Sequence, residues 1–398
     1  MGASEFRPPL RISHVITRLI VGGAQENTVA SVLGLRQRPG LQLQLISGPT
    51  VGPEGSLEHE FASAPGLLTL LPHLVRPIHP WKDARALGAL VAWFRRQAPH
   101  VVHTHSGKAG LLGRLAARRA RVPIIVHTVH GPSFGPFQGA LANYAFRSAE
   151  RFAARFTTHF VVVAEAMARQ YLAAGVGHAG QFTCIRSGFE MAPFLAAKND
   201  PAVRARWGLA PTDFVVGKIA RFFKLKGHED LFVMAPKLAK RCPQVKFLLV
   251  GDGPWLVRFK ARARAAGLER HTVFTGLVPP GEIPGLIGVM DVLLHLSQRE
   301  GLARALPQAL AASRPVVAYD CDGAGEVCRE GETGFLVRPG DLTNLTLRLL
   351  QLAADSALCQ RLGQRGQAMV REAFSVDRMV AELEALYARL AAARQTTS

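Results

Sequence analysis

The second half of the chain places two cations where a diphosphate could bind. The stretch from Val215 to Phe232 is an apolar strand pattern that ends in Arg221 and Lys226 before a helical pattern begins. Two cations at such a turn can clamp a diphosphate, because the planar arginine fork contacts two oxygens and lysine adds a point charge. This stretch therefore predicts an anion site at the end of a strand.

A second stretch, residues 297–339, combines a carboxylate with an expected helix start. Glu300 comes directly before Gly301 and Leu302, and a run of good helix formers follows. Amides at a helix start attract phosphate, since they lack partners within the helix and the helix dipole is positive there. The carboxylate suits sugar hydroxyls instead, because these donate hydrogen bonds to an ionised acceptor. We therefore expect one end of a nucleotide-sugar pocket here.

The two stretches resemble the donor domain of retaining GT-B glycosyltransferases of family four type. This large family includes bacterial glycogen synthases and the mannosyl and glucosyl transferases of cell-envelope assembly. The resemblance extends nearly end to end, through Gly323, Glu326 and the GETGFLV segment at 331–337. Each short motif alone is weak, but their order and spacing over about half the chain make the signal specific.

The resemblance assigns roles to the residues of the second half. It implies that Arg221 and Lys226 bind the donor diphosphate, that Glu300 binds the donor sugar, and that the amides of Gly301 and Leu302 bind phosphate. The family has a second glutamate, which holds the ribose, where this chain has Gln308. Glutamine can still accept from a ribose hydroxyl, but it has no charge, so this contact is expected to be weaker.

In the first half, Gly22 and Gly23 follow an expected strand, ahead of a helix predicted to begin near Gln25. They allow a tight turn and close approach of the donor to the backbone, although a plain strand-to-helix turn also explains them. Lys108 lies beside another helix start and could contact acceptor or phosphate; a surface lysine explains it equally well. Neither this turn nor GDGPWL, from Gly251, fits G-x-G-x-x-G, so dinucleotide binding is poorly supported.

Histidines gather at the ends of two expected strands in the first half: His103, His105, His127 and His130. A metal site there would need carboxylate or cysteine ligands, which are missing nearby in the sequence, so no metal is expected. The HTVHGPSF segment resembles the family loop in which the histidine before glycine reaches the donor sugar. That residue here is His130, and the resemblance implies hydrogen bonding at the reacting sugar.

The chain has a formal charge of +19, which predicts an anionic partner. Basic residues recur on the helical patterns of the first half, at Arg95, Arg96, Arg114, Arg118, Arg119, Arg121, Arg147, Arg151 and Arg155. A solvated helix face explains any one helix, whereas several together favour contact with anionic lipid headgroups. Five cysteines without C-x-x-C spacing indicate neither a disulfide framework nor a zinc site.

Short apolar runs alternate with amphipathic helical segments along all 398 residues. This pattern predicts an α/β protein with two Rossmann-like, doubly wound domains, and the resemblance implies a GT-B pair facing each other across a cleft. We expect an N-terminal acceptor-side domain at 1–190 and a donor-binding domain at 191–373. A final helix at 374–398 has an apolar stripe at helical spacing and is expected to pack back on the first domain.

The resemblance therefore implies a retaining hexosyltransferase. It would move a hexose from a nucleoside diphosphate sugar, with uridine as the expected base, to an acceptor hydroxyl in polysaccharide, lipopolysaccharide or glycolipid assembly. The nucleotide sugar is a substrate, and no cofactor or metal is expected. A sugar nucleotide epimerase of the same fold is the alternative, and a nucleic-acid-binding protein ranks last because few aromatic residues could stack bases.

We expect a cytoplasmic protein, peripheral on the inner face of the plasma membrane. No run of about 18 apolar residues appears, and the N-terminus lacks the apolar stretch of a signal peptide. The expected partners are the nucleotide sugar, a glycan or lipid-linked acceptor and an anionic membrane surface, with no nucleic acid.

Overall fold

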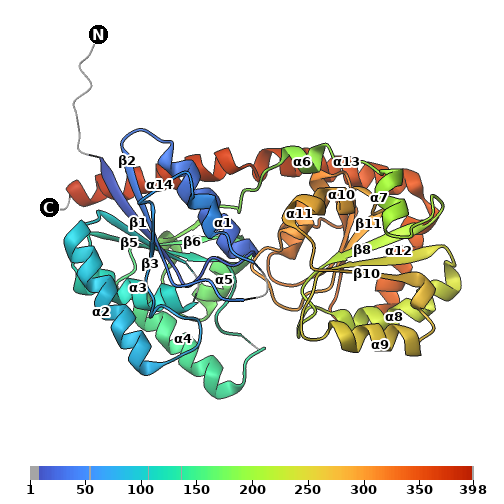
Figure 1. The fold of residues 1–398 in the computed structure, drawn as a ribbon, viewed down its shortest axis with the longest axis horizontal. Coiled ribbons are helices and arrows are strands. Elements are labelled where there is room, and N and C mark those ends of the chain that lie inside the picture. The colour runs from blue at the N-terminus through green and yellow to red at the C-terminus, as the bar shows by residue number, and fades with distance from the viewer. Residues whose placement is uncertain (1–8, 53–54, 106, 136, 397–398) are drawn as a thin grey trace, which may run out of the picture. The chain divides into compact units, whose positions relative to one another are not determined.

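The computed structural model describes residues 9–52, 55–105, 107–135 and 137–396. The sequence analysis expected no signal peptide at the N-terminus, and residues 1–8 of that segment lie outside the described residues. The chain divides into two compact units, Met1–Phe189 with Val376–Ser398 and Glu190–Ser375 (Figure 1). The sequence placed these divisions after residues 190 and 373. Among the described helices, none is long and apolar enough to cross a membrane.

The first unit is built on a seven-stranded parallel sheet, in the order β3-β2-β1-β4-β5-β6-β7. Its strands are β1 (Leu10–Ile16), β2 (Leu41–Ser47), β3 (Leu68–Leu70), β4 (Val101–His105), β5 (Ile124–Val129), β6 (His159–Val162) and β7 (Phe182–Cys184). Its helices are α1 (Gly23–Arg36), α2 (Pro80–Gln97), α3 (Gly107–Arg119), α4 (Ala140–Ala154), α5 (Glu165–Ala173) and α14 (Val376–Gln395). The central strands β4, β5 and β6 are buried on both faces because helices cover both.

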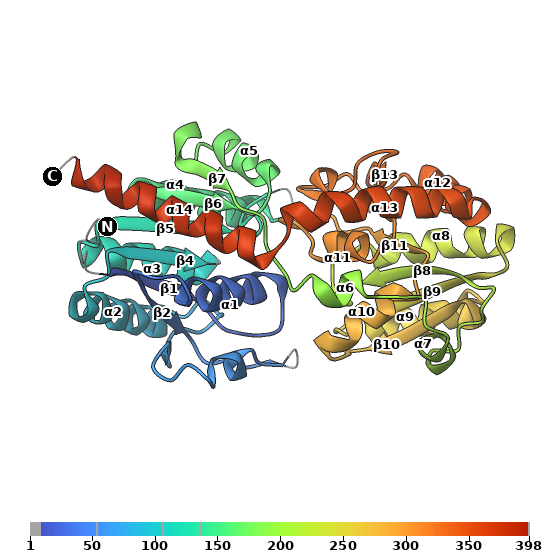
Figure 2. The same ribbon diagram turned by 90° about the horizontal axis from the view of Figure 1, so that it is seen from above.

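Alternation along β1 shows how the two faces of this sheet are buried. Ile12 and Ile16 pack with α1 and α14, whereas Val15 points the other way and packs with α2 and α3. Met379, Leu383 and other apolar residues of α14 join the first of these cores. The apolar stripe of the last helix is thus buried in the first unit, and Figure 2 shows α14 lying along it.

The second unit has a six-stranded parallel sheet, in the order β10-β9-β8-β11-β12-β13. Its strands are β8 (Phe214–Ile219), β9 (Val245–Val250), β10 (Thr272–Gly276), β11 (Val292–His295), β12 (Val316–Tyr319) and β13 (Gly334–Val337). Its helices are α6 (Ala192–Leu195), α7 (Pro201–Arg206), α8 (His228–Arg241), α9 (Leu256–Ala265), α10 (Ile283–Gly288), α11 (Ala305–Ala311), α12 (Leu342–Ala354) and α13 (Ser356–Ala373). The prediction of two doubly wound α/β domains is confirmed.

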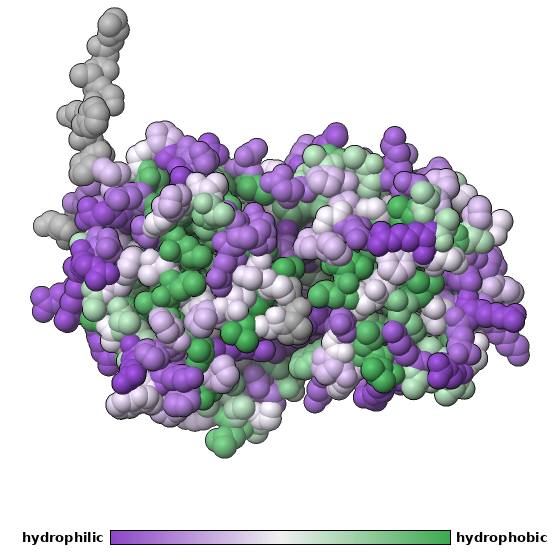
Figure 3. Space-filling view, in the orientation of Figure 1, coloured by the Kyte–Doolittle hydropathy of each residue, from purple (hydrophilic) through white to green (hydrophobic). Residues whose placement is uncertain are grey.

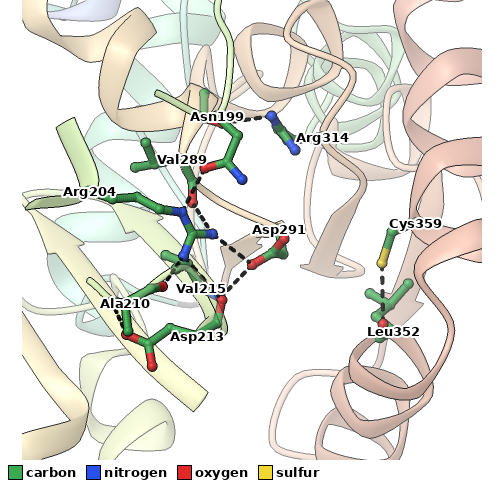
Figure 4. Close-up of polar contacts among 11 residues, drawn as sticks. Asn199, Arg204, Ala210, Asp213, Val215, Val289, Asp291, Arg314, Leu352 and Cys359 are labelled. Atoms are coloured by element: carbon green, nitrogen blue, oxygen red, sulfur yellow. Dashed lines mark hydrogen bonds and ion pairs between the residues drawn. The ribbon is translucent and has the colours of Figure 1, made fainter. Parts of the chain in front are cut away.

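A buried arginine ties the entry into the second unit to its sheet. Arg204 of α7 donates to Asn199 Oδ1 at 2.6 Å and to the Ala210 carbonyl at 2.6 Å (Figure 4). It also lies 3.7 Å from Asp291, whose carboxylate accepts from the Val215 amide at 2.7 Å. These contacts lie where β8 and β11 begin. They therefore stabilise the amino-terminal ends of these strands, whereas the predicted site residues follow the carboxyl ends.

Candidate active site

The predicted donor residues follow two neighbouring strands, β8 and β11, at the place where the strand order of the second sheet reverses. Arg221 and Lys226 come after β8, and Glu300 comes after β11. Carboxyl ends of parallel strands meet at one edge, and ligands of open α/β sheets bind outside that edge at such a reversal. The topology therefore gathers residues about 75 positions apart in the sequence at one place.

Lys226 and Glu300 form an ion pair in the structure, with Lys226 Nζ against Glu300 Oε1. Ser297 donates to the same oxygen at 2.9 Å, and the Glu300 amide donates to Asp322 Oδ2 at 2.7 Å. Burial alone raises the pKa of the Glu300 carboxyl, but Lys226, His295 and the hydrogen bond from Ser297 outweigh it, so the pKa is lowered. The site thus holds an ionised carboxylate beside an ammonium.

Arg221 lies in the loop after β8 and is exposed. Its carbonyl accepts from His228 Nε2 at 3.0 Å, and the His228 ring stacks on Phe222 with centroids 4.3 Å apart. Burial, with Lys218 nearby, lowers the pKa of His228 to about 3, so this ring is neutral. A neutral, packed histidine therefore holds the turn from which the guanidinium extends.

The structure corrects the expected helix start after Glu300. The helix α11 begins at Ala305, so Gly301 and Leu302 lie in the preceding loop and their amides are not the first amides of a helix. The Gly301 carbonyl accepts from the Gly323 amide at 3.1 Å, which ties this loop to the one after β12. Gln308 lies on α11 and is partly exposed. Any phosphate contact of this loop would thus come from loop amides, without a helix dipole.

The sequence analysis missed Lys218, which lies within β8 and is 1% exposed. Its Nζ has no hydrogen-bond partner among the described residues. Burial, with the positive charge of Lys226, lowers its pKa to about 7, although Glu300, Asp230 and Glu229 act in the opposite direction. The signal in the sequence was a lone lysine inside an otherwise apolar strand pattern.

In the first unit, His130 follows β5 and is partly exposed, with its Nε2 atom 3.0 Å from His105 Nδ1. Burial lowers the pKa of His130 to about 4.

The helix α1 begins at Gly23, two residues earlier than expected, and Gly22 caps it in an extended conformation. Gly22 and Gly23 therefore form the strand-to-helix turn, as expected, but Gly22 needs no left-handed conformation.

Two basic side chains of the first unit form ion pairs with carboxylates of the same unit. Lys108 contacts the Asp83 carboxylate and the Pro77 carbonyl, and its side chain is 13% exposed, so much of its charge is already used within the first unit. Arg114 is fully buried, donating to Glu150 at 2.7 Å and to the Gly110 carbonyl at 2.8 Å. Arg114 therefore joins α3 to α4 and is not part of a basic surface.

The histidines of the first unit are closer together than the sequence indicated. His14, His103 and His105 are buried, with ring nitrogens within 4.8 Å of one another, so this group could hold a metal ion. His14 was missed, because it lies about 90 residues before the others; the parallel register of β1 and β4 sets it opposite His103. His127 points elsewhere and contacts Thr104 Oγ1 at 2.9 Å.

Two family models match the chain, one in each unit. The glycosyl transferases group 1 model matches residues 199–369, and the glycosyl transferase 4-like domain model matches residues 22–185. Together they span most of both units. The chain belongs to the GT-B glycosyltransferases of family four type, which confirms the resemblance drawn from the sequence.

Curated relatives and solved structures agree with this family. The chain is 25% identical to the UDP-Gal:alpha-D-GlcNAc-diphosphoundecaprenol alpha-1,3-galactosyltransferase of Escherichia coli, over 80% of this chain and 82% of the relative. It is 28% identical to the GDP-mannose-dependent alpha-(1-6)-phosphatidylinositol monomannoside mannosyltransferase of Mycolicibacterium smegmatis, over 69% and 70%. The structure of Anabaena Alr3699/HepE in complex with UDP and glucose has a TM-score of 0.80 at 22% identity, covering 96% and 100%. The prediction of a glycosyltransferase is confirmed.

Proposed function

We propose that the protein transfers a hexosyl unit, with retention of anomeric configuration, from a nucleoside diphosphate sugar to an acceptor hydroxyl in polysaccharide, lipopolysaccharide or glycolipid assembly. The observation that carries this proposal is the Lys226–Glu300 pair outside β8 and β11, with Arg221 in the same loop after β8. Cations suit the diphosphate, and an ionised carboxylate suits the sugar hydroxyls. UDP is the expected leaving group, because the Escherichia coli relative uses UDP-Gal and HepE was solved with UDP.

The proposed reaction breaks the bond between the anomeric carbon and a diphosphate oxygen and forms a bond to the acceptor oxygen. Positive character develops on the sugar and negative charge on the diphosphate, which Arg221 and Lys226 would stabilise. Attack on the same face as the departing group retains configuration, and the acceptor proton passes to a diphosphate oxygen. His130 would hydrogen-bond the transferred sugar, Gln308 the ribose, and Gly22 and Gly23 would approach the diphosphate. We expect activity to persist with a chelator present.

Product analysis tests this function. The full-length protein would be incubated with a panel of UDP- and GDP-hexoses and a membrane extract, and the products would be identified by mass spectrometry. A new acceptor product carrying one added hexose, with free nucleoside diphosphate, is expected from one donor. Glu300→Gln should abolish most of this product. An epimerised nucleotide sugar, or free hexose alone, would contradict the proposal.

We also propose that the first unit contacts an anionic membrane. Leu141 and Tyr144 of α4 are 83% and 66% exposed. Arg147 and Arg151 of the same helix and Arg155, its C-cap residue, recur every four residues. Apolar side chains protrude over α4 in Figure 3. An apolar strip beside arginines suits the headgroup region, where each cation contributes about 1 kcal/mol. The exposed Arg118 and Arg119 of α3 add to this charge.

Liposome sedimentation tests the membrane proposal. The protein should pellet with anionic vesicles at low salt and release as salt rises, because salt screens exposed charges. The variants Leu141→Ser/Tyr144→Ser and Arg118→Glu/Arg119→Glu should bind less. Val257→Ser, which removes an equally exposed apolar side chain from the second unit, is the matched control. Equal pelleting of all these variants would contradict a role for α3 and α4.

A further inference from the structure

Six side chains of the first unit form one continuous hydrogen-bonded chain, called here the histidine chain. His130 Nε2 lies 3.0 Å from His105 Nδ1, and His105 Nε2 lies 2.9 Å from His14 Nδ1. The Tyr387 hydroxyl then joins two rings, at 3.3 Å from His14 Nε2 and 2.5 Å from His103 Nδ1. The chain ends at Thr128 Oγ1, which lies 2.6 Å from His103 Nε2. Its members come from strands β1, β4 and β5, from the residue that directly follows β5, and from the C-terminal helix α14. His130 alone is partly exposed; the other five are buried.

The rings of the histidine chain are neutral. Burial lowers the pKa of His14 to about 3 and that of His130 to about 4, and it holds those of His103 and His105 well below their ordinary range. A neutral imidazole has one N–H donor and one acceptor nitrogen. Both nitrogens of the three buried rings are used in the chain. Each ring must therefore donate in one direction and accept from the other. The buried Tyr387 hydroxyl has one hydrogen, and its partners among the described residues are His14 and His103, so it donates to one ring and accepts from the other. Only two orientations of the whole chain give this hydrogen an acceptor.

The Thr128 hydroxyl distinguishes the two orientations. If Thr128 accepts from His103, its own buried hydrogen needs another acceptor, and the described residues offer none to Thr128 Oγ1 in the structure. If Thr128 donates to His103 Nε2, every proton in the chain has an acceptor. A buried donor without a partner is costly. The second orientation is therefore favoured.

We infer that the histidine chain runs from Thr128 to His130 and holds His130 as its Nδ1–H tautomer, with Tyr387 as a positioning residue at the middle of the chain. Thr128 donates to His103, His103 to Tyr387, Tyr387 to His14, His14 to His105, and His105 to His130 Nε2. What His130 contacts rests on the proposed function. In this tautomer it can donate Nδ1–H to an oxygen of the transferred sugar, but its other nitrogen is occupied. It is therefore a hydrogen-bond donor and not a general base.

A metal ion at His14, His103 and His105 is the competing account. The ring nitrogens that would bind an ion already take part in the chain, with His14 Nδ1 only 2.9 Å from His105 Nε2. An ion there would have to replace these hydrogen bonds. The two accounts therefore predict different states of the same nitrogens, which one spectrum can distinguish.

Long-range ¹H–¹⁵N correlation of the ligand-free, ¹⁵N-histidine-labelled protein reads the tautomer of each ring without any need for activity. The signals of His130 are identified by their loss in His130→Gln. In the wild type we expect His130 to be protonated on Nδ1. Thr128→Val removes the terminal donor, so a share of His130 should change to the Nε2–H tautomer, and Thr128→Ser should restore the original state. A wild-type His130 protonated on Nε2 would overturn the inference.

Tyr387→Phe tests the middle of the chain. It should also release part of His130 to the Nε2–H tautomer and lower kcat about ten-fold, the effect expected when a partner that orients a functional histidine is lost, with little change in KM for the donor. Tyr171→Phe removes another buried tyrosine hydroxyl of the same unit outside the chain and is the matched control. Unchanged His130 signals in folded Tyr387→Phe would refute the role of Tyr387.

Metal content decides the competing account. The purified protein should contain no stoichiometric transition metal, and Zn²⁺ or a chelator should leave the histidine signals in place. Stoichiometric metal, or shifted signals of His14, His103 and His105, would make the cluster a metal site and overturn the histidine chain. If the tautomers are as expected but no donor supports transfer, the histidine chain stands and the proposed function fails.

Discussion

Replacing Lys226 with alanine should weaken UDP binding strongly while leaving the fold intact. The Lys226 side chain is 24% exposed and that of Glu300 is 28% exposed, so the pair lies between a surface ion pair and a buried one. A bound diphosphate would share the ammonium, which has three donors, with the Glu300 carboxylate. Losing one charge-assisted contact costs about 1.5 to 3 kcal/mol, or roughly a 10- to 150-fold rise in Kd.

The paired variant Glu300→Gln separates diphosphate binding from sugar binding. It removes a negative charge beside the expected diphosphate, so UDP affinity should stay the same or rise. Transfer should nevertheless fall sharply, because the amide accepts hydrogen bonds from sugar hydroxyls more weakly than a carboxylate. Isothermal titration calorimetry with UDP, together with a transfer assay, measures both. The reasoning would be refuted if folded Lys226→Ala bound UDP as the wild type does, or if Glu300→Gln lost UDP binding and transfer equally.

The remaining predictions concern stability and charge. Lys218→Met should raise the free energy of unfolding by on the order of 3 to 5 kcal/mol below pH 7, because the Lys218 amine binds a proton more tightly in the unfolded chain than in the folded one. This gain in stability should shrink as pH rises from 7 to 10. A pH-independent difference in urea unfolding would contradict the buried ammonium. Arg114→Leu should lower the free energy of unfolding by about 3 to 5 kcal/mol, because it leaves Glu150 buried without its cation. The double variant Arg114→Leu/Glu150→Leu should recover much of that loss. Equal stability of the single and double variants would contradict this reasoning. Arg221→Ala should weaken UDP binding by about 1.5 to 3 kcal/mol. The midpoint of urea unfolding should stay the same, because Arg221 is exposed. An unchanged UDP affinity in calorimetry would show that Arg221 does not belong to the binding site.

The sequence predicted the fold well because long parallel strands carry a strong apolar signal. The edge strands β3, β7 and β13 have only three or four residues, and such short runs give little periodicity in the sequence. The predicted pair of Lys226 and Glu300 meets because both follow strands that are neighbours in the sheet. Because the family resemblance implied the order of the strands, it could place Lys226 and Glu300 in one site although they lie 74 positions apart in the sequence.

Other features depended on contacts that no local pattern indicates. Arg114 belongs to a basic helical pattern that looks solvated, yet its partner Glu150 comes 36 residues later and buries it. The histidine chain joins His14 to Tyr387 across 373 positions, and Tyr387 lies on the last helix, for which the sequence predicted only packing through its apolar stripe. Such long-range partners decide burial and charge, and the sequence alone does not show them.

The stereochemistry of the first product tests the central claim most directly. With the donor identified in the panel, ¹H NMR of the reaction in progress reports the anomeric configuration of the new linkage before any slower change. The account predicts that the new linkage has the same configuration as the donor, and that its formation rate falls in Lys226→Ala and Glu300→Gln. An initial product of inverted configuration, or normal formation in both variants, would contradict it.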